Sequence, residues 1–197
     1  MKETFLAVIL ILIIAGLMFR EQLAALIIPL TTPVENSNPF QKEFAGIKIN
    51  FRANLDEAQK IPVYPDEKGL IFTLLDNNVK EIGIAYIPND TENAFYAAAS
   101  YELTFKLTVI NKYYFDQVKY IDSIPVNSTE EAFNISNNTR PIIMLLGPSN
   151  ANSTSVNVNG YLIIAQGKSF GETNEKPYTD LDLAVDKILL VLMNTSI

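Results

Sequence analysis

The sequence contains no cysteine, no histidine and no tryptophan. Without cysteine and histidine there are no disulfide bonds, thiolate nucleophiles, Cys/His zinc sites, Ser-His-Asp triads or His- or Cys-ligated haems. A chain without cysteine also lies outside the disulfide-rich class of small secreted proteins. From the sequence we therefore assign no catalytic residue, no metal ligand and no cofactor.

Basic residues are also scarce. The chain has 15 Lys and Arg against 22 Asp and Glu, and its net charge is −7. A nucleic-acid partner needs a basic face that replaces phosphate counterions, and no Lys/Arg cluster is present, so we expect no nucleic-acid binding. Apolar residues make up 48% of the chain, which is enough to build a sizeable core.

The N-terminus carries the one long hydrophobic segment. Residues Phe5 to Phe19 contain no charged side chain, and a second apolar run covers Leu23 to Leu30. A continuous helix from Phe5 to Ile28 would be about 36 Å long, and the hydrocarbon core of a bilayer is about 30 Å thick. The sequence predicts a transmembrane anchor over residues 1–30, then a linker over 31–43 and a folded domain over 44–197.

The charges around this segment favour an inside N-terminus. Lys2 and the free amino group lie before the apolar run, while Arg20 and Glu21 cancel each other after it. We therefore expect a single-pass protein of the cell membrane with its domain outside. A cleaved signal peptide and a buried core helix are the alternatives for the same segment.

Asn-x-Ser/Thr triplets support the outside location. The sequence contains six of these glycosylation signals, whereas random placement of its Asn, Ser and Thr residues predicts about two. Turns also collect these residues, which is the other source of such an excess. An anchor, a Cys-free body and dense glycosylation signals together resemble an archaeal envelope protein in style. The six signals begin at Asn89, Asn127, Asn134, Asn137, Asn152 and Asn194.

Strands and helices alternate along the rest of the chain. The pattern predicts one Rossmann-like α/β domain with a mixed β-sheet and flanking helices. The expected strands cover 44–53, 61–65, 79–87, 140–147 and the hairpin 155–165, and the expected helices cover 54–60, 67–78, 92–110 and 179–193.

Local signals fix several boundaries of these elements. Asn54, Asp66, Thr91 and Thr179 are the expected helix caps, and Asn159-Gly160 is the expected hairpin turn. Residues 111–140 cannot be assigned well. We expect the polar stretch 122–139 within them to be an exposed excursion that carries glycans, because it contains few large apolar side chains.

The loop 145–155 is the candidate ligand site, because ligands of α/β sheets bind beyond the carboxyl ends of strands. Gly147 would let a ligand approach the backbone, and Ser149 and Asn150 would offer neutral hydrogen-bonding groups. The plainer interpretation is a solvated loop with a glycan at Asn152. No Gly-x-Gly-x-x-Gly motif or Walker lysine supports phosphate binding.

Two groups of charged residues invite functional readings that we do not adopt. Asp180, Asp182 and Asp186 would suggest a metal or acid–base site, since Asp182 and Asp186 lie one turn apart. We expect helix capping and solvation instead, with Asp186 next to Lys187. Glu102 lies within an apolar helix, and we expect it to pair with Lys106 one turn later. A general acid with a raised pKa is the alternative for Glu102.

These observations predict a non-catalytic binding or assembly module of the cell envelope. Its expected partners are the membrane, through the N-terminal helix, and another protein or envelope component. One alternative is a His- and Cys-free glycan hydrolase that uses two carboxylates. The other is a small-ligand-binding module that uses the 145–155 loop.

Overall fold

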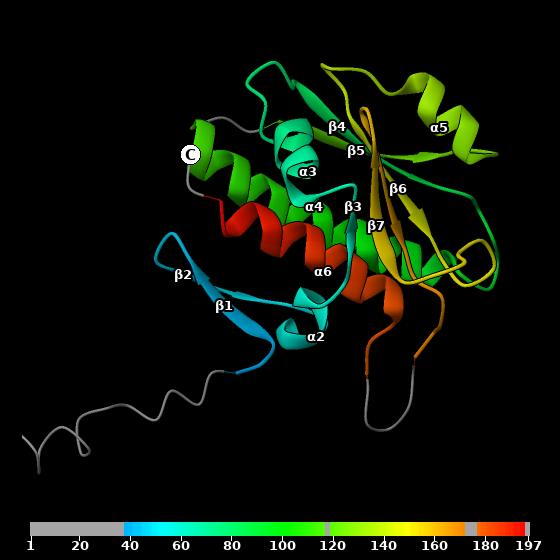
Figure 1. The fold of residues 1–197 in the computed structure, drawn as a ribbon, viewed down its shortest axis with the longest axis horizontal. Coiled ribbons are helices and arrows are strands. Elements are labelled where there is room, and N and C mark those ends of the chain that lie inside the picture. The colour runs from blue at the N-terminus through cyan, green and yellow to red at the C-terminus, as the bar shows by residue number, and fades with distance from the viewer. Residues whose placement is uncertain (1–37, 117–118, 172–176, 196–197) are drawn as a thin grey trace, which may run out of the picture. The chain divides into compact units, whose positions relative to one another are not determined.

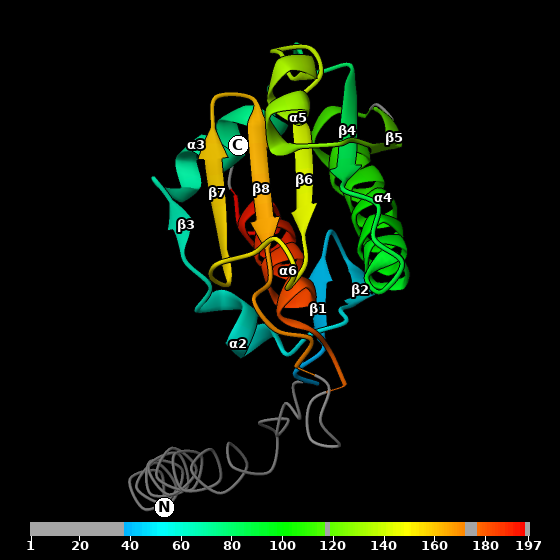
Figure 2. The ribbon, with the colours of Figure 1, turned by 90° about the vertical axis from the view of Figure 1, so that its right-hand side faces the viewer.

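A six-stranded sheet forms the centre of the computed structural model, which describes residues 38–116, 119–171 and 177–195 (Figures 1 and 2). Its strand order is β3-β7-β8-β6-β4-β5. Four neighbouring strands, β8, β6, β4 and β5, run parallel, and β7 runs antiparallel to β8. The predicted α/β class with a mixed sheet is confirmed. The strands are β3 (Val63–Tyr64), β4 (Glu81–Tyr86), β5 (Tyr120–Pro125), β6 (Ile142–Leu146), β7 (Ser155–Asn159) and β8 (Leu162–Gln166).

Helices cover the two faces of this sheet unequally. Side chains from α2, α3, α4 and α6 pack with Ile82, Ile84 and Ile143 of the sheet in the larger core. The short helix α5 packs on the other face, where it lies in front of β6 in Figure 2. The helices are α2 (Leu55–Gln59), α3 (Glu67–Leu74), α4 (Asn93–Phe115), α5 (Thr129–Ile135) and α6 (Asp180–Met193).

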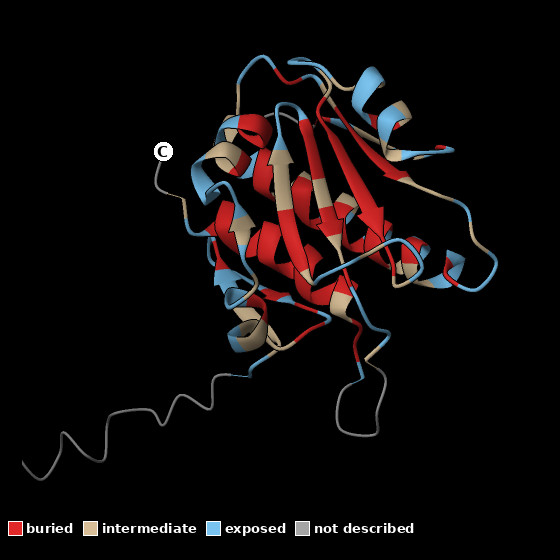
Figure 3. Cartoon of the chain, turned by 45° about the vertical axis from the view of Figure 1, so that its right-hand side comes forward, coloured by how far each residue is buried: buried red, intermediate tan, exposed pale blue. Residues whose placement is uncertain are grey.

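Helix α6 is the most deeply buried helix of the described chain, and every residue from Leu181 to Met193 is buried (Figure 3). It contacts β7 and β8 of the sheet and the helices α2, α3 and α4. The predicted capping box begins it. Asp182 N donates to Thr179 Oγ1 at 3.1 Å, and Thr179 N donates to Asp182 Oδ2 at 2.8 Å. The box satisfies backbone donors that burial would otherwise leave unpaired.

Most of the predicted caps are confirmed, and one is wrong. Asn54 and Asp66 accept hydrogen bonds from the first turns of α2 and α3. Gly160 has φ 60° in the turn between β7 and β8, as the predicted hairpin requires. Thr91 does not cap α4, because its own N–H and hydroxyl donate to Asn89 Oδ1. The helix also continues to Phe115 instead of ending at Ile110.

The expectation that residues 122–139 form an exposed excursion is wrong in part. The segment begins within β5, an edge strand whose backbone pairs with β4 from Tyr120 to Pro125. The side chains of Val126 and Ala132 are buried. An edge strand accepts polar side chains, since one of its edges faces solvent, and this composition resembles that of a loop. Ser128 then caps helix α5, because its hydroxyl accepts from Glu131 N at 3.1 Å.

A separate antiparallel hairpin precedes the sheet. It consists of β1 (Gln41–Phe44) and β2 (Ile47–Asn50), so a strand includes the last residues assigned above to the linker. Ile49 and Phe44 are buried, but Ile47 is 55% exposed. The Phe44 ring packs edge-on against Tyr113 near the end of α4, at a centroid distance of 4.8 Å.

The membrane anchor predicted over residues 1–30 lies outside the described residues. Within the part of the chain that the structure describes, no helix has both the length and the hydropathy needed to span a bilayer.

Candidate functional site

The predicted ligand-site residues meet the start of α4 beyond the carboxyl end of β6. Ser149 N donates to Glu92 Oε1 at 2.8 Å. Tyr96 OH donates to Glu92 Oε2 at 2.6 Å and accepts from Gly147 N at 3.0 Å. Asn150 closes the turn by donating from its N–H to Gly147 O at 3.0 Å. The structure therefore brings Gly147, Ser149 and Asn150 together around a carboxylate that the sequence did not single out.

Glu92 fills the space that a ligand would need at this place. The residue is fully buried, and a Cβ added to Gly147 would lie 2.8 Å from its carboxyl carbon. In open α/β sheets, ligands usually enter the crevice where neighbouring strands connect in opposite directions. Here β4 leads to β5 on one side, and β6 leads to β7 and β8 on the other. Gly147 makes room for the protein's own carboxylate, and ligand binding by the 145–155 loop stays a prediction.

Tyr96 keeps its proton in this arrangement. Burial, together with the hydrogen bond to Glu92, raises the pKa of its phenol to about 12. The phenol therefore donates to Glu92 throughout the neutral range. Its ring also packs against that of the neighbouring Tyr86, with the two ring centroids 5.7 Å apart. The Glu92–Tyr96 pair thus holds together the ends of β4, β6 and α4.

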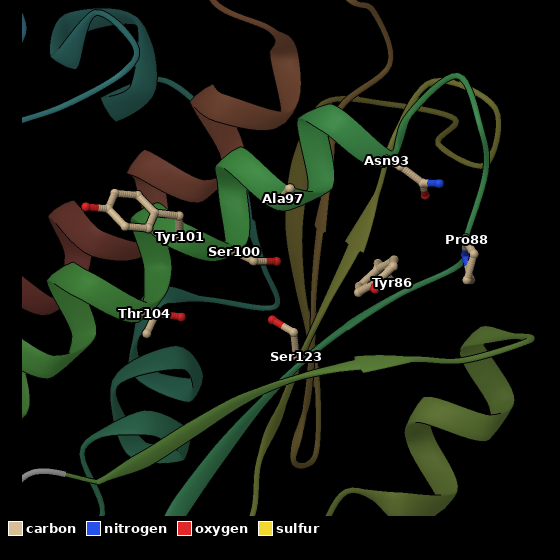
Figure 4. A pocket seen from close by; sticks show the side chains of 8 residues that line it. All are labelled: Tyr86, Pro88, Asn93, Ala97, Ser100, Tyr101, Thr104 and Ser123. Atoms are coloured by element: carbon tan, nitrogen blue, oxygen red, sulfur yellow. The ribbon is translucent and has the colours of Figure 1, made fainter.

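A pocket of about 470 Å³ lies on the other side of β4, between α4 and the edge strand β5 (Figure 4). Its lining comprises aromatic, small and hydroxyl side chains with one amide, and no Asp, Glu, Lys or Arg among them. Ser100 and Thr104 reach it from α4, Ser123 from β5 and Tyr86 from β4. The hydroxyls of Ser100 and Ser123 face each other across the gap in Figure 4.

Ser100 contributes a buried polar group to the pocket. It is 7% exposed, and within the described chain its hydroxyl has no hydrogen-bond partner. A helical serine commonly bonds the carbonyl one turn earlier, but Ser100 does not. A buried hydroxyl without a partner costs about 1–3 kcal/mol. Sequence reasoning missed this pocket, because a serine and a threonine in an alanine-rich helix carry no motif.

A buried cluster of charges lies elsewhere, where α4, α6 and the segment after β2 meet. Glu102 and Lys106 form the predicted ion pair. Arg52 Nε donates to Asp182 Oδ1 at 2.7 Å, and the backbone N–H of Arg52 donates to Glu102 Oε1 at 3.2 Å. Lys106 Nζ also lies 3.9 Å from Asp186 Oδ1 and 3.8 Å from the centre of the Phe51 ring.

Asp186 was expected to be solvated beside Lys187, and this is wrong. Its side chain is fully buried, and its Oδ2 accepts from Ala53 N at 2.8 Å. Lys187 instead pairs with Glu67 at 2.7 Å and donates to a backbone carbonyl of α2. The difference arises because α6 is covered on all sides, so a helix position that seems to face solvent is interior.

Burial raises the pKa of Asp186 well above its usual range, and the negative charge of Glu102 raises it further. Asp186 Oδ1 has no hydrogen-bond donor within the described residues. A proton on that oxygen would remove a negative charge from the interior. The ion pairs of Glu102 with Lys106 and of Asp182 with Arg52 would then remain.

This cluster offers neither a metal site nor an exposed acid. In the ranges that the structure describes, no three His, Cys, Asp or Glu side chains are grouped to hold a metal ion. None of the cluster's carboxylates lines the α4–β5 pocket. The arrangement therefore ties α4, α6 and the segment after β2 together, and it is separate from the accessible cavity.

The predicted glycosylation sites lie at the surface. Asn127, Asn134, Asn137, Asn152 and Asn194 are exposed, and Asn89 is partly buried. Asn89 also uses its side chain internally, because its Nδ2 donates to Ser149 Oγ at 3.3 Å. Exposure meets the first requirement for attachment of a bulky, hydrated glycan. Modification of these residues stays a prediction.

No protein-family model, no curated protein and no solved structure matches the chain.

Proposed function

We propose that this chain is a membrane-anchored, extracytoplasmic, non-catalytic binding or assembly module of the cell envelope. One observation carries the proposal. The accessible α4–β5 pocket has no carboxylate, lysine or arginine in its lining, while Glu102 and Asp182 are held in ion pairs and Asp186 is buried beside them, away from the pocket. Uncharged hydrogen-bonding groups beside an aromatic ring suit recognition of a ligand better than general acid–base chemistry.

The location rests on two further features. The apolar segment from Phe5 to Ile28 is long enough to cross a bilayer, and five of the six glycosylation signals have exposed asparagines. The membrane would be one partner, through this segment, and a protein or another envelope component the second. The acidic excess gives a nucleic acid no favourable surface.

A Rossmann-like arrangement is part of this proposal. The unit β4–α4–β5 joins two parallel neighbouring strands through a helix, and the connections after β4 and β6 lead in opposite directions at the place filled by Glu92. The chain would then retain the architecture of a ligand-binding fold while its usual ligand crevice holds an internal carboxylate. Binding would take place instead on the far side of β4.

The alternatives have less support. A glycan hydrolase needs two carboxylates about 5–10 Å apart that face the same cleft, and the described pocket presents none. Binding at the 145–155 loop would require the Glu92 carboxylate to leave its two hydrogen-bond donors, Tyr96 OH and Ser149 N. No specific observation favours either function over a binding module.

Protease treatment of intact cells tests the location. We expect a protease added outside to remove the domain from a cell-associated stump that ends near residue 35. Protection of the domain in intact cells, with digestion only after lysis, would contradict the proposal. A cytoplasmic protein fused to the same epitope serves as the control for cell integrity.

Mass spectrometry of peptides from the native source tests glycosylation. We expect a glycan on at least one of Asn127, Asn134 and Asn137, because all three are exposed. Asn134 and Asn137 are close in sequence, so crowding is expected to leave one of them bare in part of the molecules. If all three are unmodified, the excess of Asn-x-Ser/Thr triplets reflects turn composition and the argument for an outside location loses its main support.

A further inference from the structure

We propose that the α4–β5 pocket binds a neutral, hydroxyl-rich ligand of one or two sugar rings. This inference rests on the proposed function as a binding module and names its ligand class. The pocket's volume of about 470 Å³ lies within the usual range for small-ligand sites, about 300–1,000 Å³. The chemistry of its lining then selects among ligands of that size.

Charge is the first criterion. The pocket's lining has no Asp, Glu, Lys or Arg. An anionic or cationic ligand would lose hydration on entry and gain no opposite charge, which is costly. The lining therefore discriminates against phosphorylated, acidic and amino ligands and favours a neutral one.

Hydrogen bonding is the second criterion. Ser100 and Ser123 place two hydroxyls opposite each other, and each can donate and accept (Figure 4). The Ser100 hydroxyl is buried and, within the described residues, has no partner of its own. Asn93 Oδ1 accepts from Asn89 N at 3.0 Å. The Nδ2 group of Asn93 is therefore the one left to donate to a ligand. A ligand with several adjacent hydroxyls matches this set of alternating donors and acceptors.

The aromatic wall is the third criterion. Tyr86 lines the pocket, and its ring is fixed against Tyr96, which Glu92 and Gly147 hold in turn. The weakly polar C–H face of a sugar ring packs on such an aromatic surface, while its hydroxyls stay free for hydrogen bonds. Because Tyr86 is held before binding, little conformational entropy is lost when a ligand arrives.

Saturation-transfer NMR on the full-length chain tests the proposal. The protein is purified in a detergent without a sugar headgroup, since a maltoside would occupy the site. The probes are glucose, galactose, mannose and N-acetylglucosamine at about 10 mM, a concentration suited to millimolar affinity. Glucuronate and glucosamine are the charged counterparts. We expect transfer to at least one neutral sugar and weaker transfer to its charged counterparts.

Two matched substitutions on α4 locate the binding. Ala97 lines the pocket and Ala94, one turn earlier, does not, although both are exposed. Leucine is a good helix former, so both Ala97→Leu and Ala94→Leu are expected to fold. We expect Ala97→Leu to weaken binding at least about tenfold by filling the cavity, and Ala94→Leu to change it less than about twofold.

Ser100→Ala separates a binding role from a structural one. It removes a hydroxyl that has no partner within the described chain, so the stability of the free protein should stay equal or rise. Affinity for the neutral sugar should fall roughly threefold to tenfold, which corresponds to one lost hydrogen bond. A drop in free-protein stability with unchanged affinity would contradict the assigned role.

The outcomes distinguish this inference from the function on which it rests. No transfer to any neutral sugar, stronger transfer to a charged sugar, or equal binding by Ala97→Leu and wild type would each overturn the inference. If the protease test still places the domain outside, the proposed envelope module stands with a different ligand. If the domain is inside, the proposed function fails, whatever the NMR experiment shows.

Discussion

Replacing Asp186 with asparagine should change the pH dependence of the protein's stability. Asp186 is fully buried between Ala53 N and the ion pair of Glu102 and Lys106. Asparagine has the same shape, and its oxygen can accept from Ala53 N as Asp186 Oδ2 does at 2.8 Å. Asp186→Asn therefore imitates the protonated carboxyl and removes only its ability to ionise.

The sign of the effect follows from proton linkage. Burial, and then the charge of Glu102, raise the pKa of Asp186 in the folded chain, so it holds a proton that the unfolded chain releases near about pH 4. This contribution to stability is complete below the unfolded pKa and is lost as the pH rises through the folded pKa. Between the two values, wild-type stability should fall by up to about 1.4 kcal/mol per pH unit because of this group.

Asparagine does not ionise, so this contribution to the pH dependence of stability is absent from the variant. The free energy of unfolding of Asp186→Asn, relative to wild type, should therefore rise with pH through the same window and then level off. Urea unfolding from about pH 4 to about pH 9 measures this difference, with an unchanged m-value as the check on two-state behaviour. Far-ultraviolet circular dichroism is the suitable signal, because the chain contains no tryptophan.

Asp116→Asn is the matched control. Asp116 ends α4 in a left-handed conformation that asparagine tolerates, and it is fully exposed. The hydrogen bond from Lys112 lowers the pKa of Asp116, so its contribution is present above its unfolded pKa and is lost only at acid pH. Its profile should run parallel to wild type above about pH 5. If Asp186→Asn also runs parallel to wild type, the buried proton is absent and the linkage argument is refuted.

Two further predictions concern packing around the buried carboxylates. Lys106→Met should lower the free energy of unfolding by about 3–5 kcal/mol, because Glu102 loses its buried cation. Adding Glu102→Gln should recover most of this loss. A loss below about 1 kcal/mol for Lys106→Met in urea unfolding would contradict the prediction. Gly147→Ala should cost about 1–3 kcal/mol, because its Cβ would lie 2.8 Å from the Glu92 carboxyl carbon. Gly69→Ala, where the nearest atom is 3.6 Å away in a helix, should be neutral or stabilising.

Local rules predicted much of the fold because their signals are self-contained. The Asn159-Gly160 turn fixed the β7–β8 hairpin, and Thr179 with Asp182 fixed the start of α6. In the same way, the spacing of Glu102 and Lys106 predicted their ion pair. Each of these features depends on residues within one turn or one hairpin of each other.

The features that the sequence did not reveal depend on distant contacts. Strand β5 has a polar composition and is ordered by pairing with β4, which follows from the backbone rather than from its side chains. The burial of Asp186 depends on helices that cover α6 from several sides. The candidate pocket likewise forms only where α4 passes over β5, so Ser100 and Ser123 have no relation that their spacing could show.

The cluster around Arg52 has a mechanical consequence. One compact unit covers Asn38–Ile197, and the turn before β1 is tied to the segment after β2, since Phe51 N donates to Phe40 O at 2.7 Å. That segment is bonded in turn to Glu102 of α4 and Asp186 of α6 through the backbone N–H groups of Arg52 and Ala53.

A pulling force on the N-terminal end would therefore load several hydrogen bonds and ion pairs at once before it reached the central sheet. Low-dielectric surroundings strengthen each of these bonds and slow their exchange with water. A chain tethered at its N-terminus would experience such a load whenever a partner pulled on the domain. The cluster whose buried carboxyl is expected to make stability depend on pH would then also carry the mechanical load.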